Sequence, residues 1–421
     1  MPNVKGTRDL LPPETGVWVR VEETARRVFG LYGYGEIRTP LLEHTELFVR
    51  SVGETTDIVG KEMYSFEDRK GRSLTLRPES TASVARAFVD HRLGDQPLPV
   101  KLYYIGPHFR YERPQKGRYR QFSQIGAELL GDAGPASDAE VVKMLVDFLE
   151  ALDFEDLTVL VHTVGDEASR ESYRVALVDY LRPLQARLSE DSRERLTRNP
   201  LRILDTKIPA ERELLAEAPK MEDSLNRESR EHFDGFRAGL DRLKVPHTVD
   251  PGLVRGLDYY TRTVFEIVSE GLGAQNAIVG GGRYDNLLSD LGGPDLPGIG
   301  FAIGQDRLVE SLPGSFRDRV GGRSTVRVIT IDPVPKVTAL EVADQLREQG
   351  IAATVDFGGD RMKAALKRAD RSGARWVVLI GEDELAEDGA TCRDLRAGEQ
   401  RFVRRSDLAS ELTSGGSEGD E

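Results

Sequence analysis

The sequence predicts an α/β protein of more than one domain, in which a sheet domain with flanking helices and a helical insertion precedes a smaller α/β domain. Three observations support this prediction. The chain has 421 residues, which is too long for one ordinary core. Residues 166–248 are rich in Arg, Glu, Leu and Asp and have a helical pattern, with strand signals on both sides. Residues 326–380 alternate strand, helix, strand, helix and strand, which is typical of a largely parallel sheet.

The composition excludes several classes of protein. Hydrophobic residues make up 39% of the chain and charged residues 31%. No apolar run of about 18 residues exists, so we expect no membrane span. The first residues lack the apolar core of a secretory signal, and Cys392 is the only cysteine, which excludes an internal disulfide and a cysteine-rich zinc site. We therefore expect a cytoplasmic protein.

The chain is predicted to begin with a helix and an edge strand. Apolar spacing predicts a helix over residues 14–32, which ends at Gly33. The pattern of residues 36–42 predicts a strand that contains Pro40. Because proline in a strand is expected at a sheet edge, we predict that this strand lies at an edge or at a subunit boundary.

A short strand, a helix and a long hairpin are predicted next. Alternating residues predict a strand over 73–77, and a helix follows through about His91, with Ser80 or Thr81 as its N-cap. Two further strands are predicted, with a basic loop between them, over residues 100–104 and 122–129.

Strand signals return after the helical insertion, over residues 264–268 and 277–279. Glycine-rich stretches at 280–282 and 292–304 indicate turns, and a helix is predicted from about Asp306.

The last part of the chain is predicted to be a linker, an α/β domain and a tail. Residues 312–325 indicate the linker, and 413–421 indicate a disordered tail of Gly, Ser and acidic residues. The domain prediction is therefore a first domain over 1–320, a second over 324–412 and a tail over 413–421. Within the second domain we predict strands over 326–331, 351–355 and 376–380, with helices over 335–349 and 361–372.

The loop within residues 109–122 is strongly basic, with four arginines and a lysine in a chain of net charge −13. A local reversal of sign favours a polyanionic partner such as phosphate. A solvated charged hairpin is the more common explanation of a basic run. Glu112 and Glu128 beside the arginines, and the planar faces of Tyr119 and Phe122 on which a base can stack, make that explanation weaker here.

A second motif, Arg-Gly-Leu-Asp-Tyr-Tyr at 255–260, suits a small zwitterion with a polar side chain. An Arg255–Asp258 pair with two half-buried tyrosines explains the same residues equally well. Together the two motifs suggest activation of an amino acid by ATP. Residues 53–61 lack the Ser or Thr of a phosphate loop, and 298–304 do not match a dinucleotide fingerprint.

With these motifs, from Lys5 through the last domain, the chain resembles the histidyl-tRNA synthetases, which are class II aminoacyl-tRNA synthetases. The three class II motifs correspond to the helix and strand ending at Pro40, to residues 103–128 and to residues 298–308, and 255–260 resembles the family's histidine-binding motif. The resemblance implies an antiparallel catalytic sheet with flanking helices and a C-terminal α/β anticodon-binding domain. It also implies L-histidine, ATP with Mg²⁺ and tRNA for histidine as partners, and a homodimer.

The resemblance also implies roles for individual residues, including two catalytic arginines, Arg110 and Arg255. It assigns histidine binding to Glu79, Ser80, Thr81, Arg110, Gln124, Glu128, Arg255, Tyr259 and Tyr260. It assigns ATP binding to Arg110, Glu112, Arg118, Phe122 and Arg307. Family members read an extra 5′ guanosine on histidine tRNA, and the residues implied for that contact are Arg113 and Gln115.

Some positions depart from the family pattern. Ser80 stands where glycine is usual, and Asp306 stands where glutamate is usual, so the magnesium ligands stay unassigned. The main alternative function is the histidine-sensing regulatory subunit of ATP phosphoribosyltransferase, which lacks the last domain and the catalytic arginines. Another class II synthetase, for proline, threonine or glycine, and an amino-acid ligase without tRNA are weaker alternatives.

Overall fold

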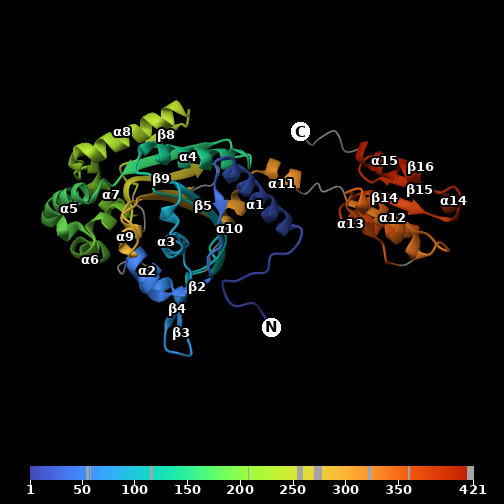
Figure 1. Cartoon of the computed structure of the whole chain (residues 1–421), viewed down its shortest axis with the longest axis horizontal. Helices are drawn as coiled ribbons and strands as arrows, with labels where there is room; N and C mark the ends of the chain where they lie inside the picture. The colour runs from blue at the N-terminus through green and yellow to red at the C-terminus, as the bar shows by residue number, and fades with distance from the viewer. Residues whose placement is uncertain are drawn as a thin grey trace. The chain divides into compact units, whose positions relative to one another are not determined.

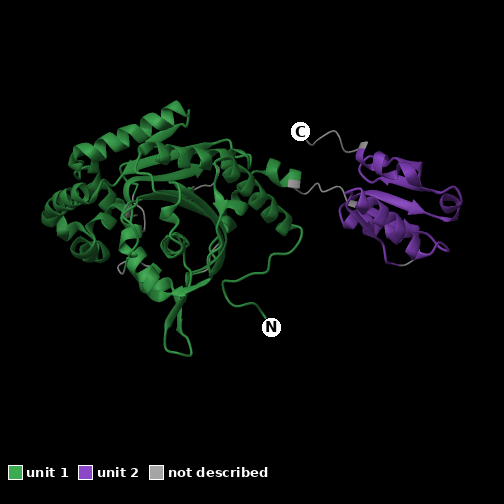
Figure 2. Ribbon diagram, viewed as in Figure 1, with its two compact units in different colours: residues 1–320 green, residues 321–421 purple. Residues whose placement is uncertain are grey.

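The computed structural model of the chain describes residues 1–53, 56, 58–113, 117–206, 208–253, 259–269, 277–320, 325–358 and 361–414 (Figure 1). The chain divides into two compact units, a first unit of residues 1–320 and a second unit of residues 321–421 (Figure 2). Within the described ranges, no helix combines the length and the apolar character needed to cross a membrane.

An eight-stranded sheet forms the body of the first unit, in the order β1-β5-β6-β11-β10-β9-β7-β8. Only the outermost pairs, β1 with β5 and β7 with β8, are parallel. The other neighbours are antiparallel. The strands are β1 (Gly35–Glu36), β5 (Val100–Phe109), β6 (Gln121–Leu130), β7 (Leu157–Thr163), β8 (His247–Val249), β9 (Thr261–Ser269), β10 (Ala277–Tyr284) and β11 (Gly298–Gly304).

Helices cover both faces of this sheet (Figure 1). One face carries the main core, in which alternate residues of β6, among them Ile125 and Leu129, pack with Phe29 of α1, Phe148 of α4 and Phe236 of α8. The other face packs against α3 and α9, where Phe88 and Leu288 are fully buried. These helices are α1 (Glu14–Leu31), α3 (Thr81–Asp90), α4 (Pro135–Glu150), α8 (Arg227–Arg242) and α9 (Leu287–Asp290).

The predicted helical insertion divides between two cores. Residues from Tyr173 to Met221 form a small core of their own, whereas Phe236 and Leu240 of α8 belong to the main core. Helix α8 is amphipathic and packs on α4. The separate helices are α5 (Glu167–Leu181), α6 (Glu190–Arg198) and α7 (Pro209–Ala216).

The predicted edge strand over residues 36–42 is wrong in extent. Its residues contribute to two sheets: β1 joins the main sheet, and β2 (Leu42–His44) joins a three-stranded sheet in the order β2-β4-β3, with β3 (Tyr64–Glu67) and β4 (Ser73–Leu76). The buried Arg77 donates to the carbonyl of Thr39 at 3.0 Å. Pro40 has no N–H to donate, so the backbone cannot continue the ladder between the two strands.

The predicted turn at 280–282 is also wrong, because these residues lie in β10. The turns predicted over 292–304 are wrong for residues 298–304, which form β11. A Cβ on Gly281 would lie 2.3 Å from the carbonyl oxygen of Gly300, and one on Gly282 would lie 2.8 Å from the ring of Tyr260. The glycines therefore allow close approach between neighbouring strands and side chains rather than chain reversal.

The predicted linker and tail are partly helical. Helix α11 (Gly314–Val320) packs on α1, and its Phe316 is buried in the main core. Thr413 and Ser414 belong to helix α15 (Leu408–Ser414). Residues 415–421 of the predicted tail lie outside the described residues.

The second unit contains a five-stranded sheet in the order β13-β12-β14-β15-β16. Its first three strands are parallel, as predicted, and β15 and β16 extend it in antiparallel fashion. Val328 and Val378 are fully buried in its core. The elements are β12 (Thr325–Thr330), α12 (Lys336–Glu348), β13 (Ala353–Val355), α13 (Met362–Arg371), β14 (Ala374–Ile380), α14 (Glu382–Ala386), β15 (Gly389–Asp394) and β16 (Gln400–Arg404).

Candidate active site

Strand β6 places polar residues on the face opposite the main core. Because side chains alternate along a strand, Gln124 and Glu128 lie on the same face, with Gly126 between them. Glu128 pairs in register with Gly300 of β11. A Cβ on Gly300 would lie 1.7 Å from Glu128 Oε2, so glycine is needed for Glu128 to occupy this position.

Glu128 is a buried carboxyl held by two hydroxyl groups. Its side chain is 1% exposed, Thr81 Oγ1 donates to Oε1 at 2.7 Å, and the hydroxyl of Tyr284 donates to Oε2. Burial raises the pKa of Glu128 to about 8, although both hydrogen bonds act in the opposite direction.

Glu79 is a second buried carboxyl, at the start of α3. It accepts hydrogen bonds from the backbone N–H groups of Thr81 at 2.7 Å and Ala82 at 3.0 Å. Ser80 is the N-cap residue of α3, as predicted, but Glu79 supplies the capping side chain, because the Ser80 hydroxyl lies 2.7 Å from His108 Nε2 instead. Burial raises the pKa of Glu79 despite these two N–H donors.

Neither carboxyl forms an ion pair with any residue in the described ranges. The Oε1 atom of Gln124 is buried and lacks a hydrogen-bond partner within the same ranges. The ring of Tyr259 completes this region, with its centroid 4.8 Å from that of Tyr260 and 5.6 Å from that of Tyr284. We call these residues the acidic half of the site: Glu79, Thr81, Gln124, Glu128, Tyr259, Tyr260 and Tyr284.

A cavity of about 450 Å³ continues from Gln124. All five residues predicted to bind ATP line it: Arg110, Glu112, Arg118, Phe122 and Arg307. Its other lining residues include Glu62, Glu266, Gly280, Gly304 and Asp306. We call this cavity and its arginines the cationic half of the site.

The arginines of the cationic half are oriented by neighbouring groups. Arg110 Nε donates to the carbonyl of Pro78 at 2.9 Å, and its guanidinium lies 5.3 Å from the centre of the Phe122 ring. Arg118 lies 3.6 Å from the carboxylate of Glu112. Burial and the nearby charge of Arg118 lower the pKa of Arg307, and the charge of Glu266 acts in the opposite direction. Such an arrangement favours a ligand with several negative charges.

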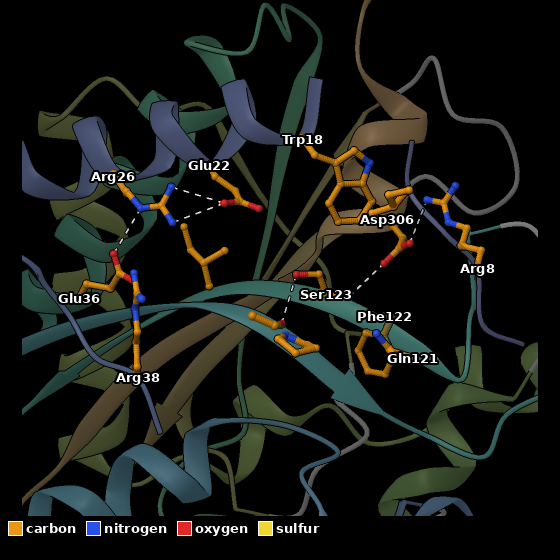
Figure 3. A pocket seen from close by; sticks show the side chains of 14 residues that line it. Arg8, Trp18, Glu22, Arg26, Glu36, Arg38, Gln121, Phe122, Ser123 and Asp306 are labelled. Carbon is orange, nitrogen blue, oxygen red and sulfur yellow. Dashed lines mark hydrogen bonds and ion pairs between the residues drawn. The ribbon is translucent and has the colours of Figure 1, made fainter. Parts of the chain in front are cut away.

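A second cavity, of about 470 Å³, lies between α1 and strands β5 and β6 (Figure 3). Its charges pair with one another: Arg26 lies 3.4 Å from Glu22 and 3.3 Å from Glu36, and Arg38 lies 2.6 Å from Glu36. Both Arg26 and Arg38 are thus paired with carboxylates of this cavity, and none of the residues predicted for ATP binding except Phe122 lines it.

Not every predicted site residue can be placed. Arg255 and Gln115 lie outside the described residues, and Arg113 is exposed. Tyr284 was missed by the sequence analysis. The spacing could have identified it, because Tyr284 lies two residues after Gly282 and four after Gly280. Once 280–282 is recognised as strand, these three residues lie on the same face of it.

Asp306 does not fit a resident metal site. One of its carboxylate oxygens accepts from Arg8 at 3.1 Å, and the other accepts from the backbone N–H of Ser123 at 3.0 Å. In the part of the chain that the structure describes, no group of three or more His, Cys, Asp or Glu residues is placed to hold a metal ion.

Two family models match the chain, and together they span most of its length. The family model described as histidyl-tRNA synthetase matches residues 6–308, and the one described as anticodon binding domain matches residues 325–414. The histidine–tRNA ligase of Nitratidesulfovibrio vulgaris (strain DP4) is 47% identical over 414 residues, with 98% of each chain covered. That of Synechococcus sp. (strain JA-3-3Ab) is 47% identical over 411 residues, again with 98% of each chain covered.

A solved structure gives the same result. The crystal structure of apo S. aureus histidyl-tRNA synthetase matches with a TM-score of 0.80 at 34% sequence identity, covering 98% of this chain and 99% of that one. The chain therefore belongs to the histidyl-tRNA synthetase family of class II aminoacyl-tRNA synthetases.

Proposed function

We propose that the chain is a histidine–tRNA ligase, which activates L-histidine with ATP to histidyl-adenylate and transfers histidine to the 3′ end of histidine tRNA. The observation that carries this proposal is the junction, at Gln124, of a buried acidic half with an open cavity lined by arginines. A zwitterion with an imidazole side chain suits the first half, and a nucleoside triphosphate suits the second.

In the acidic half, histidine is bound through its nitrogen atoms. The α-ammonium group lies at Glu79 and Gln124, whose unpartnered Oε1 atom is an acceptor, with Ser80 and Thr81 at the same helix start. The imidazole lies at Glu128 and Tyr260, and Tyr259 lines the pocket. An imidazole N–H that donates to Glu128 favours its ionised form, and therefore offsets the effect of burial.

In the cationic half, ATP is bound through its base and its phosphates. The adenine faces Glu112 and stacks on Phe122, and Arg118 and Arg307 hold the outer phosphates. Mg²⁺ enters with ATP as part of the substrate and neutralises phosphate charge; no protein ligand is assigned to it.

The chemical step joins the two halves. A carboxylate oxygen of histidine attacks the α-phosphorus, and the bond from that phosphorus to the pyrophosphate oxygen breaks. Negative charge develops on the α-phosphate oxygens, where Arg110 and Arg255 stabilise it. Fixed guanidinium groups do this without reorganisation during the reaction, which is why they are effective.

In this proposal, the second unit and the residues Arg113 and Gln115 bind the tRNA. Residues 325–414 match the anticodon binding domain model, and Arg113 and Gln115 contact the acceptor end. We also propose a homodimer whose two-fold interface includes the segment that ends at Thr39 and Pro40, and action in the cytoplasm, where tRNA is charged for translation. The regulatory-subunit alternative is not favoured, because Arg110, Arg118 and Arg307 all line the cavity and the last domain is present.

ATP–pyrophosphate exchange across all twenty amino acids tests the proposal. Exchange is expected with histidine, and apolar amino acids are expected to be slower by about 10⁴-fold or more, because they leave buried polar groups unpaired. Absence of exchange with histidine, or faster exchange with another amino acid, would refute the assignment.

Removal of residues 324–421 tests the division between the two units. Exchange should survive and tRNA charging should be impaired, once size-exclusion chromatography and circular dichroism show that the truncated protein is folded. A folded truncation that charges tRNA normally would contradict the role of the second unit.

A further inference from the structure

Arg8, in the segment that precedes α1, contacts three separate parts of the first unit. Its Nη1 atom donates to Glu14 at 2.9 Å, and its Nη2 atom donates to Asp306 at 3.1 Å. Its guanidinium also lies over two rings, 4.6 Å from the centre of Tyr119 and 5.8 Å from that of Trp18. Glu14 and Trp18 belong to α1, Tyr119 to the β5–β6 loop and Asp306 to α10 (Gln305–Ser311).

These three parts correspond to the three class II motifs identified in the sequence. Arg8 therefore connects helix α1, which belongs to the first motif, with the two segments that carry the arginines of the cationic half. Arg110 and Arg118 lie in the second motif, and Arg307 directly follows Asp306.

Asp306 transmits the contact to β6 (Figure 3). Its side chain is 7% exposed, and its second oxygen accepts from the backbone N–H of Ser123 at 3.0 Å. Ser123 directly follows Phe122, which lines the cationic half together with Asp306 and Arg307. The ion pair from Arg8 thus fixes a carboxylate that holds α10 against the end of the hairpin.

The backbone beside Arg8 holds the same loop by a separate contact. The carbonyl of Gly6 accepts from the backbone N–H of Arg120 at 2.7 Å, and the carbonyl of Arg120 accepts from the N–H of Arg110 at 2.9 Å. Gly6 has φ +85°, and a Cβ there would lie 2.7 Å from Arg120 Cγ. Glycine at this position permits both the backbone conformation and the close approach.

Arginine has properties at position 8 that lysine lacks. Its planar fork can pair with Glu14 and Asp306 at once while its face lies over Tyr119, whereas an ammonium group is a single point charge. The Asp306 end of this contact is largely shielded from water, so it is expected to be stronger than a surface ion pair.

We propose that Arg8 is a positioning residue for ATP binding, which ties helix α1 to the β5–β6 loop and to α10 and so holds the arginines of the cationic half in place before ATP arrives. The proposal deepens the proposed function, because it assumes that the cationic half binds ATP. It does not depend on which amino acid is activated.

Equilibrium binding to the full chain tests the proposal. The dissociation constants for MgATP, with no amino acid present, and for histidine, with no ATP present, are measured by calorimetry for the wild type, Arg8→Ala and Arg8→Lys. Arg20→Ala is the matched control, because Arg20 lies on the outer side of α1 and its side chain is 63% exposed.

Loss of a positioning contact is expected to raise the dissociation constant for MgATP about 10- to 100-fold in Arg8→Ala, with a smaller rise in Arg8→Lys. The value for histidine should stay within about twofold of the wild type, and Arg20→Ala should change neither. A folded Arg8→Ala protein with wild-type affinity for MgATP, or with equal losses for both ligands, would overturn the proposal. If Arg8→Ala does not fold, the test rests on Arg8→Lys. Wild-type affinity of Arg8→Lys for MgATP would overturn the proposal, and a loss of affinity for MgATP but not for histidine would support it.

A double-mutant cycle with Asp306→Asn tests the route through Asp306. If Arg8 acts through this carboxylate, Asp306→Asn should weaken MgATP binding less in the Arg8→Ala background than in the wild type. Equal effects in the two backgrounds would contradict that route. Absence of histidine-dependent exchange in the wild type would refute the proposed function, whereas the MgATP constants would still report on Arg8.

Discussion

Asp138 and Glu128 are both buried carboxyl groups of the first unit, and they are held in opposite ways. Asp138, on α4, is 0% exposed and accepts hydrogen bonds from Arg283 Nε at 3.1 Å and from His232 at 2.8 Å. Arg283, itself fully buried, also donates to the carbonyls of Asp132 and Gly134. Burial raises the pKa of Asp138, but the hydrogen bond from His232 and the charge of Arg283 outweigh it, so this pKa lies below its ordinary value.

Glu128 has no such cation in the described part of the chain. Its two partners are hydroxyl groups, and burial raises its pKa to about 8. The chain thus supplies a cation for Asp138, the carboxyl that connects α4, α8 and β10. For Glu128, the proposed function supplies the missing donor from the bound histidine. In that proposal, the difference distinguishes a carboxyl that stabilises the fold from one that binds a ligand.

Asp138→Asn should have the largest effect on stability. It leaves the buried Arg283 with only the partly exposed Asp285, at 3.3 Å, as a counter-charge, so the free energy of unfolding should fall by about 3 kcal/mol, the lower end of the range for a broken buried pair. Urea unfolding followed by circular dichroism measures the change. The control is Asp90→Asn, which removes a partner of Arg86 that is 57% exposed and should cost less than about 1 kcal/mol. Equal small losses in the two variants would show that the buried network is not required.

Glu128→Gln should have a smaller effect on stability, and its sign should depend on pH. The pKa of Glu128 in the folded state, about 8, lies above its ordinary value of 4.5, so the folded state binds the proton more tightly than the unfolded state does. The contribution of Glu128 to stability is therefore present at low pH and is lost as the pH rises from about 4.5 to about 8.

Thermal unfolding at a series of pH values measures this dependence. Glutamine does not titrate, so the wild type should lose stability relative to Glu128→Gln as the pH rises through this range. A difference that stays constant, or that changes in the opposite direction, would show that Glu128 is ionised throughout and that its pKa is not raised.

The sequence predicted those elements of the fold and of the site that depend on a local residue pattern. The strands of the hairpin, the helix before Gly33 and the alternation of strands and helices after residue 325 follow from periodicity and from glycine and proline signals. The five residues predicted to bind ATP line a single cavity, because four of them lie on or beside one hairpin.

Long-range contacts could not be predicted in the same way. Glu128 and Tyr284 are 156 residues apart, and no local pattern connects them. The glycines of β10 and β11 resemble turn signals because their purpose, room for Glu128 and Tyr260, is visible only across strands. The N-cap position of α3 at Ser80 could be predicted from residue preference, whereas the contact of its hydroxyl with His108, which leaves the capping hydrogen bonds to Glu79, could not.

Arg113→Ala should have the smallest effect on the first unit itself. Arg113 is exposed, so its removal should leave stability and ATP–pyrophosphate exchange nearly unchanged. The charging of histidine tRNA should fall about tenfold, and discrimination against tRNA that lacks the extra 5′ guanosine should weaken. Equal losses in exchange and in charging would place Arg113 with the ATP site instead.

In the proposed function, Glu128, which has no cationic partner among the described residues, binds histidine. Binding of histidine in the absence of ATP tests this assignment most directly. The dissociation constant is measured by calorimetry for the wild type, for Glu128→Gln and for Arg118→Ala, in which the change lies in the cationic half. Loss of a hydrogen bond to a charged group should raise the constant at least about tenfold in Glu128→Gln, and Arg118→Ala should leave it within about twofold. An unchanged constant in Glu128→Gln, or equal losses in the two variants, would contradict the distinction between the two carboxyl groups.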